Sequence, residues 1–354
     1  QRQMCIRDRS NGGYICAGNT SITGNEYGDL LLIKINQSGE QEWMHNLSFS
    51  PSDRANMLLE ETDTGIIIAG TTISTINGSK DVLIVKTNQS GHVEWYRNYG
   101  NDEDQEAHYI HKLSDNSYII CGQSVEQNTG FNMLLIMKLD IDGNELWSNT
   151  YGGNGDDFGY SVIEENDGSL LVTGMTKSSG DLNGDAWLLK IDSSGNEYWR
   201  KTYGGTSKDL TRHFIGTSDG YMLIGNTTSY GSGNDDIFVI KVDLDGNQEW
   251  SNTYGGVGTD IGRKIINYNN EGYALIGYTD SFGTGNSFNS WLIKIDLSGN
   301  LIWDKTYGGD GNDRSLSGLK TTDDGFIIVG FSDSNQNNLS NVSVIKTDNS
   351  GNIE

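Results

Sequence analysis

The sequence predicts an all-β protein built from about seven copies of one four-stranded unit, and three observations carry that prediction. A tryptophan recurs at intervals of 52, 52, 52, 51 and 53 residues, at Trp43, Trp95, Trp147, Trp199, Trp250 and Trp303. A lysine stands nine residues before each tryptophan, and Lys346 begins a seventh copy. Glycine occurs 47 times and proline once, so the turns depend on Gly, Asn and Asp. A period near 50 residues is typical of radial or stacked repeats.

Each copy is expected to begin with two antiparallel strands joined by a tight turn. The first strand follows a glycine-rich loop, as in LTRHFIGTSD at 210–219, and ends at a pair such as Asp219-Gly220. Asp-Gly between apolar runs predicts a hairpin, because glycine accepts the positive φ that the turn requires. The second strand is short and apolar and closes on a glycine, as in GYMLIG at 220–225.

The third and fourth strands indicate how the copies assemble. The third is a nearly continuous apolar run that ends in the lysine, as in DIFVIK at 236–241, so both of its faces are expected to be covered. After a short turn the fourth strand carries the tryptophan, as in QEWSNTYGG at 248–256. Four-stranded antiparallel units with two buried faces must stack face to face, which predicts a β-propeller of about seven blades. A β-solenoid is the rival, but its repeats are usually shorter than about 30 residues.

The repeat also suggests where the fold begins and ends. Residues 1–10, QRQMCIRDRS, do not fit the unit, and we interpret them as a non-native N-terminal segment. Residues 11–354 are expected to form a single propeller domain in which the first copy lacks its first strand and the seventh lacks its fourth. Closure at seven blades stays open at this point. We expect further sequence beyond both ends, and a monomer within a larger multidomain chain.

The charge balance excludes several classes of partner. Acidic residues outnumber basic ones 48 to 24, which gives a net charge of −24. Nucleic acid and anionic membranes are poor partners for such a chain, because phosphates are neutralised by clustered lysine and arginine. No apolar run reaches transmembrane length, so we expect no membrane insertion. The acidic surface is in keeping with solubility outside the cell or in salty water.

Two polar series recur with the repeat. The first lies five residues before the lysine, at Asp29, Asp81, Asp185, Asp236, Asn289 and Asn341. The second lies ten residues after the tryptophan, at Asp53, Asp157, Asp209, Asp260 and Asp313, with Gln105 in the second copy. Either series could bind a cation such as Ca²⁺, the second with neighbours such as Asn154 and Asp156. Repetition in every copy favours structure instead, with carboxylates that cap loop N–H groups and lysines that pair with carboxylates or carbonyls.

Other motifs are better explained by structure than by chemistry. Asp140–Asn144 echoes a calcium loop but lacks a third acidic ligand and a distal Glu, so a hairpin turn explains it. Gly216–Gly220 matches a nucleophile elbow by letters, but it joins two predicted strands rather than a strand and a helix. His108 and His111 stand three apart on a strand, so they should face opposite ways and share no metal. We therefore assign no catalytic, cofactor-binding or metal-binding residue.

The tryptophans admit two interpretations. A repeated series could stack sugars, but a tryptophan at a fixed strand position more often fills the wedge between blades. Trp187 and Trp291 occupy the third strand in two copies only, and we expect both to belong to the core. No cluster of carboxylates and aromatic residues is evident in one or two copies, as an enzyme would require.

Read as a whole, the unit DxWLxKxDxxGNxxWxxTYGG resembles the delta-sixty-like propeller repeats of secreted bacterial and archaeal proteins. The resemblance covers residues 11–354 and is strongest from Asp185 to Gly277. The first copy departs from it with LSFSPSD, and the third has Met133 where others have Asp or Asn. The resemblance implies a scaffold that is secreted or held at the cell surface, and it transfers no catalytic residues.

These observations together predict a non-enzymatic, extracellular or cell-surface module without a cofactor. It would bind a protein or glycan through the loops between the second and third strands, which vary most between copies. The alternative is a lectin-like or polysaccharide-active propeller, which could depend on calcium.

Overall fold

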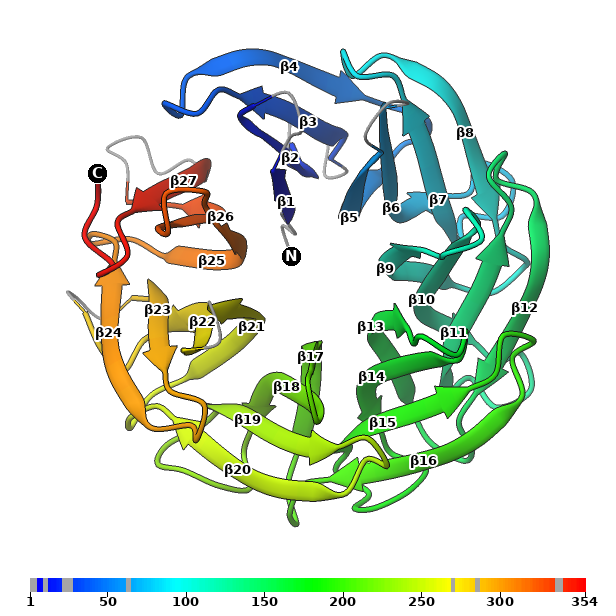
Figure 1. Ribbon diagram of the computed structural model, residues 1–354. Coiled ribbons are helices and arrows are strands. Elements are labelled where there is room, and N and C mark those ends of the chain that lie inside the picture. Colours follow the sequence, from blue (N-terminus) through cyan, green and yellow to red (C-terminus); the bar gives the residue numbers. More distant parts are fainter. Residues whose placement is uncertain are drawn as a thin grey trace. The chain divides into compact units, whose positions relative to one another are not determined.

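The computed structural model describes residues 5–8, 12–20, 28–61, 65–268, 271–283, 287–334 and 340–354. Within these ranges the regular secondary structure is β-strand throughout, arranged in seven antiparallel sheets whose strands follow chain order. Six sheets have four strands and the seventh has three, which confirms the predicted β-propeller fold with about seven blades (Figure 1). None of the described residues belongs to a helix that is long and apolar enough to cross a membrane.

The chain divides into two compact units, Gln1–Leu182 with Leu188–Arg200 and Asn183–Trp187 with Lys201–Glu354. Blades 1 to 4 comprise β1(Cys5–Asp8), β2(Tyr14–Asn19), β3(Leu30–Ile35), β4(Gln41–Leu47); β5(Asp53–Glu61), β6(Gly65–Ile73), β7(Lys80–Thr87), β8(Val93–Tyr99); β9(Gln105–Lys112), β10(Tyr118–Val125), β11(Asn132–Leu139), β12(Glu145–Tyr151); and β13(Asp157–Glu164), β14(Leu170–Thr176), β15(Asp185–Ile191), β16(Glu197–Tyr203). Blades 5 to 7 comprise β17(Asp209–Thr217), β18(Gly220–Thr227), β19(Asp236–Asp243), β20(Gln248–Tyr254); β21(Asp260–Tyr268), β22(Gly272–Thr279), β23(Asn289–Ile295), β24(Leu301–Tyr307); and β25(Asp313–Lys320), β26(Phe326–Ser332), β27(Asn341–Thr347).

Inside each unit, successive blades bury their second and third strands against one another. In unit 1 one core cluster joins Leu32 of blade 1, Ile68 and Ile84 of blade 2 and Ile120 of blade 3, all fully buried. In unit 2 Val239 of blade 5 belongs to one cluster with residues of blade 6, and a second cluster joins blades 6 and 7. The apolar runs of the third strands are therefore covered on both faces, as their sequences predict.

In blades 2 to 6 the fourth strand ends in a tyrosine and reaches forward to the next blade. Its tyrosine donates its hydroxyl to the carbonyl of a turn glycine 43–45 residues ahead, in the pairs Tyr99–Gly143, Tyr151–Gly195, Tyr203–Gly246, Tyr254–Gly299 and Tyr307–Gly351. The repeat tryptophan lies against the same turn: a Cβ on Gly299, whose φ is +80°, would come within 2.8 Å of the Trp250 ring. Tyrosine and tryptophan thus form a clamp on that glycine, which confirms the packing interpretation of the tryptophans.

The first blade corrects one expectation. β1 pairs with β2 in register, with Cys5 opposite Ala17 and Asp8 opposite Tyr14, and the Ile6 side chain is only 1% exposed. The first copy therefore does not lack its first strand, and excluding residues 5–8 from the fold is wrong. The residues directly before CIRD, QRQM, do not match the glycine-rich loop of the repeat, so the repeat pattern does not identify this strand. Residues 1–4 and 9–10 lie outside the described part, and the non-native origin of the segment stays a prediction.

Candidate functional site

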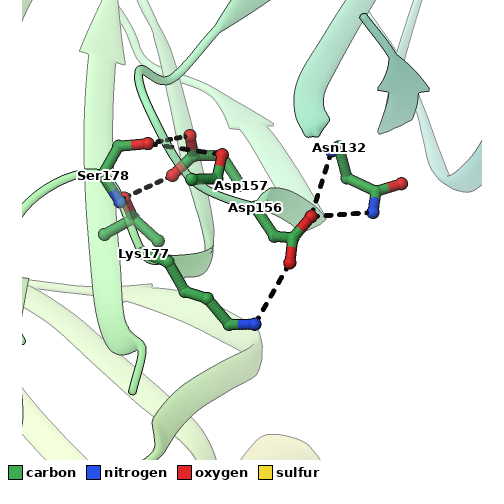
Figure 2. Close-up of polar contacts among 7 residues, drawn as sticks. Asn132, Asp156, Asp157, Lys177 and Ser178 are labelled. Carbon is green, nitrogen blue, oxygen red and sulfur yellow. Dashed lines mark hydrogen bonds and ion pairs between the residues drawn. The ribbon is translucent and has the colours of Figure 1, made fainter. Parts of the chain in front are cut away.

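The second polar series holds the loops between blades. A carboxylate oxygen of each aspartate accepts a backbone N–H four residues upstream, at 3.0 Å for Gly153 to Asp157 and 2.8 Å for Gly256 to Asp260. Gln105 does the same with its amide oxygen, which accepts the N–H of Asn101 at 2.9 Å. Serine adds a second contact, since the Ser178 hydroxyl donates to Asp157 at 2.6 Å (Figure 2). The capping interpretation is confirmed.

Asp156, a possible calcium ligand by sequence, binds groups of the protein itself. Figure 2 shows its carboxylate between Lys177, whose Nζ lies 3.1 Å away, and Asn132, which donates both its backbone and its side-chain N–H. Burial raises the pKa of Asp156, but the hydrogen bonds from Asn132 and Lys177 outweigh it and lower the pKa overall. Among the described residues, no three or more His, Cys, Asp or Glu side chains are grouped so as to hold a metal. Calcium dependence stays a prediction.

Most of the repeated lysines form ion pairs, as expected, whereas Lys294 lies 3.7 Å from the ring centroid of Tyr268. Lys138 lies 2.9 Å from Asp115 and Lys346 lies 2.6 Å from Asp323, and in both pairs the aspartate belongs to the turn that follows the first strand. Blades 1 and 2 depart from this pattern, because Lys34 pairs with Glu42 of β4 and Lys86 pairs with Glu61. Asp185, Asp236 and Asn289 of the first polar series are buried at the start of the third strand, where the Asp236 carboxylate accepts the N–H of Ser232 at 2.8 Å. In these contacts the repeated lysines and the first polar series stabilise the fold.

The remaining motifs have structural partners too. One Asp140 oxygen accepts the N–H groups of Asp142 and Asn144, which makes the suspected calcium loop a hydrogen-bonded turn. His108 lies 2.7 Å from the carbonyl of Gly159 through Nδ1, whereas burial lowers the pKa of His111. β17 ends at Thr217 and β18 begins at Gly220, so the segment joins two strands and no nucleophile elbow exists there.

A cavity of about 840 Å³ in unit 2, here the unit 2 cavity, breaks the symmetry of the repeat. It lies along blades 5 and 6 and is lined by Tyr230, Phe238, Ser251, Asn252, Thr253, Tyr254, Gly255, Phe282, Trp291, Ile293, Gly299, Asn300, Leu301 and Asp304. Aromatic side chains provide much of this wall. The ring centroids of Phe282 and Trp291 lie 5.2 Å apart, and Phe282 remains 42% exposed, so the aromatic surface is open to a ligand.

Polar groups of the unit 2 cavity are oriented by hydrogen bonds. The indole Nε1 of Trp291 donates to Oδ2 of Asp304 at 3.0 Å. The carbonyl of Gly299 accepts the Tyr254 hydroxyl at 2.6 Å and the Asn252 amide at 3.0 Å. Burial raises the pKa of Tyr254 to about 12, so its hydroxyl stays protonated at neutral pH. The cavity therefore presents fixed aromatic faces and one exposed carboxylate.

A smaller cavity of about 470 Å³, here the unit 1 cavity, occurs in blades 2 and 3. Its lining is Tyr99, Gly100, Asn101, Gln105, Ser124, Leu135, Met137, Glu145, Ser148, Asn149 and Thr150. Tyr99 is the one aromatic residue of this wall. Apart from the tyrosine, the wall is aliphatic and polar, so it offers little surface on which a planar or cationic group could stack.

Sequence reasoning missed the unit 2 cavity. It expected Trp291 in the core, and the side chain is indeed only 4% exposed, but the same ring also lines the cavity. One signal was available: the residue after the repeat tryptophan is acidic in the sixth copy alone, at Asp304. Trp291 and Asp304 stand at fixed positions of the same copy, on strands that pair, so their contact follows from the register.

Comparison with known proteins identifies the fold. No family model and no curated protein matches the chain. Puromycin hydrolase shares the fold with a TM-score of 0.54 at 11% identity, over 100% of this chain and 53% of that chain. Pyrococcus horikoshii acylaminoacyl peptidase has a TM-score of 0.51 at 13% identity, over 99% of this chain and 52% of that chain. The propeller domain of the Trilobed protease from Pyrococcus furiosus has a TM-score of 0.50 at 10% identity, over 97% of this chain and 93% of that chain. The chain thus spans about half the length of the first two proteins.

These neighbours correct the function expected from the sequence. The expected function, a non-enzymatic structural or interaction module with a glycan-binding alternative, is wrong, because hydrolases and peptidases recur among the similar structures. At identities of 10–13% the likeness shows the fold alone, so an activity of this chain is a matter for proposal. Location, partners and the delta-sixty-like resemblance stay predictions.

Proposed function

We propose that this chain is the propeller module of a peptidase, in which it binds peptide while a separate domain performs the hydrolysis. Two of the similar proteins are puromycin hydrolase and acylaminoacyl peptidase, and in both the matched propeller accounts for about half of the chain. That proportion supports a division of labour between a propeller and a second domain. The Trilobed protease offers a further case of a propeller domain within a protease.

The observation that carries the proposal is the unit 2 cavity. Its volume of about 840 Å³ falls within the range of about 300–1,000 Å³ that is typical of ligand pockets. Aromatic walls with a few polar groups suit one or two side chains of an extended peptide. Nothing in the cavity pairs a nucleophile with a base, since Asp304 contacts the Trp291 indole and Ser251 accepts the amide of Gln248. The site is therefore suited to binding rather than to cleavage.

The proposal is tested on the complete reading frame that contains these residues. We expect the full protein to cleave fluorogenic aminoacyl or peptidyl substrates, and an activity-based hydrolase probe to label a residue outside 1–354. The 354-residue chain on its own should bind the same peptides without cleaving them. A full protein that neither cleaves such substrates nor takes up the probe would overturn the proposal.

A further inference from the structure

We infer that the unit 2 cavity selects the ammonium group of a lysine side chain in a bound peptide, with Asp304 as its counter-ion. The inference rests on the proposed peptide-binding function and adds the chemical class of side chain that is recognised. Three features carry it: the aromatic faces, the single charge of the lining, and the absence of an internal cation at that charge in the described part of the chain.

The aromatic faces come from different segments that meet at one place. Trp291 lies on β23, Phe282 on the loop before it, and Tyr254 at the end of β20 in the preceding blade. Their positions are held by contacts of the fold: Trp291 by Asp304, and Tyr254 by the carbonyl of Gly299. Electron-rich ring faces attract organic cations, and tryptophan does so most strongly. A preformed wall of this kind costs little ordering on binding.

The charge of the lining has one sign. Asp304 is the one charged residue of the wall, which contains no lysine, arginine or histidine. Trp291 Nε1 donates a hydrogen bond to Oδ2 of Asp304, and among the described residues no cation pairs with this carboxylate. Lys305, the next residue along β24, lies toward blade 7, where its Cγ would be 2.9 Å from a Cβ on Gly351. The net charge of −24 further favours a cationic ligand over an anionic one.

A lysine side chain satisfies both features at once. Its four-carbon stem can lie along the exposed face of Phe282 while the ammonium meets Asp304 and the edge of the aromatic wall. A neutral side chain of similar length, such as norleucine, would gain the apolar contacts and leave the carboxylate without a partner. Phenylalanine would gain stacking alone. The contrast among these three side chains therefore isolates the charge.

The test uses the 354-residue chain and three capped tripeptides, acetyl-Ala-X-Ala-amide with X as lysine, norleucine or phenylalanine. Binding is followed through the indole N–H resonance of Trp291, assigned with the Trp291→Phe variant, and by calorimetry. We expect the lysine peptide to bind at least about fivefold more tightly than the norleucine peptide, and the difference to shrink as salt is raised. The Asp304→Asn variant, which keeps an acceptor for Trp291, should lose that preference.

A matched control lies in unit 1. Glu145 is an exposed carboxylate that lines the unit 1 cavity, where its Oε1 accepts the Ser148 hydroxyl at 2.6 Å, so Glu145→Gln should leave the lysine preference unchanged. Equal binding of the norleucine or phenylalanine peptide overturns the inference but leaves the proposed peptide-binding function standing. If no peptide shifts the Trp291 resonance, the inference also fails. Cleavage and probe labelling of the complete protein then judge the proposed function separately.

Discussion

The unit 1 cavity and the unit 2 cavity occupy equivalent positions of the repeat but differ in chemistry. Tyr99 and Tyr254 stand at one position, and each donates its hydroxyl to a turn glycine of the next blade. At the variable positions Leu135 is replaced by Trp291, and Ser148 by Asp304. The comparison teaches that the clamp residues build the blade contacts, whereas residues between them decide what a cavity can bind.

A second contrast concerns buried charge. In unit 1 the Glu61 carboxylate binds Lys86 and, at 2.9 Å, Lys112, and it accepts the Tyr118 hydroxyl at 2.5 Å. The corresponding lysine of blade 5, Lys241, is buried too, but it pairs with Asp219 and Glu249, whose side chains are largely exposed. The carboxylate is therefore buried in blade 2 and exposed in blade 5, and we expect this difference to appear in the free energy of unfolding.

The largest effect is expected from Glu61→Gln. This change removes the negative charge that pairs with the buried Lys86 ammonium, which should lower the free energy of unfolding by roughly 3 kcal/mol or more. Asp219→Asn is the matched variant in unit 2, and because its carboxylate is exposed the cost should stay below about 1 kcal/mol. Urea unfolding of both variants checks the contrast. Equal losses in the two would contradict it.

An intermediate effect tests the part that the two units share. Tyr151→Phe and Tyr254→Phe each remove a hydroxyl that donates to a turn glycine at 2.6 Å. Tyr151→Phe should cost about 1–2 kcal/mol, because the Gly195 carbonyl loses a buried hydrogen bond. Tyr254→Phe should cost less, because the Gly299 carbonyl still accepts the Asn252 amide. Thermal and urea unfolding check this order, and a larger loss for Tyr254→Phe would contradict it.

The smallest effect is a gain. Burial, with a contribution from Asp260, raises the pKa of Asp236 in unit 2, and burial with Asp104 raises that of Asp81 in unit 1. A raised folded-state pKa favours folding below the unfolded pKa of about 3.9, and this advantage is lost as the pH rises through the folded value. Asp236→Asn should therefore stabilise the protein at pH 7 by less than about 1 kcal/mol.

The stability of the Asp236→Asn variant at acidic pH distinguishes an effect of the raised pKa from a general effect of removing a charge. Below about pH 4 the carboxyl is protonated in both states, so the advantage of Asp236→Asn should disappear there. Asp81→Asn serves as the partner variant in unit 1 and should behave in the same direction. Blade 6 already carries Asn289 at this position, which shows that the amide fits. An Asn variant that is less stable at pH 7 would contradict the assigned cause.

Much of the fold was predictable because the repeat samples each strand several times. The run expected at 236–241 is β19, Asp236–Asp243, and the tryptophan strand expected at 248–256 is β20, Gln248–Tyr254. The aspartate caps were predictable as well, since a carboxylate at a fixed distance from a glycine loop suits one local geometry. Strand β1 was not, because its four residues have no loop of the usual pattern before them.

The unit 2 cavity was beyond sequence reasoning for a physical reason. Its wall combines Tyr254, which every complete neighbouring copy shares, with Phe282 and Trp291, which depart from the common pattern. A repeat alignment marks such departures one at a time. Whether Phe282 and Trp291 of blade 6 face the same space as Tyr254 of blade 5 depends on the register of the strands and on side-chain direction, and these follow from the packed structure.

The glycine clamp has a consequence for how such a gene can change length. Every tyrosine finds its glycine 43–45 residues downstream, always in the following copy and never in its own. Duplication or loss of one whole copy by unequal recombination therefore leaves each surviving hydroxyl with a carbonyl ahead of it, wherever the crossover falls within the period. The number of blades can in this way change in one step, without new hydrogen bonds between blades having to evolve first.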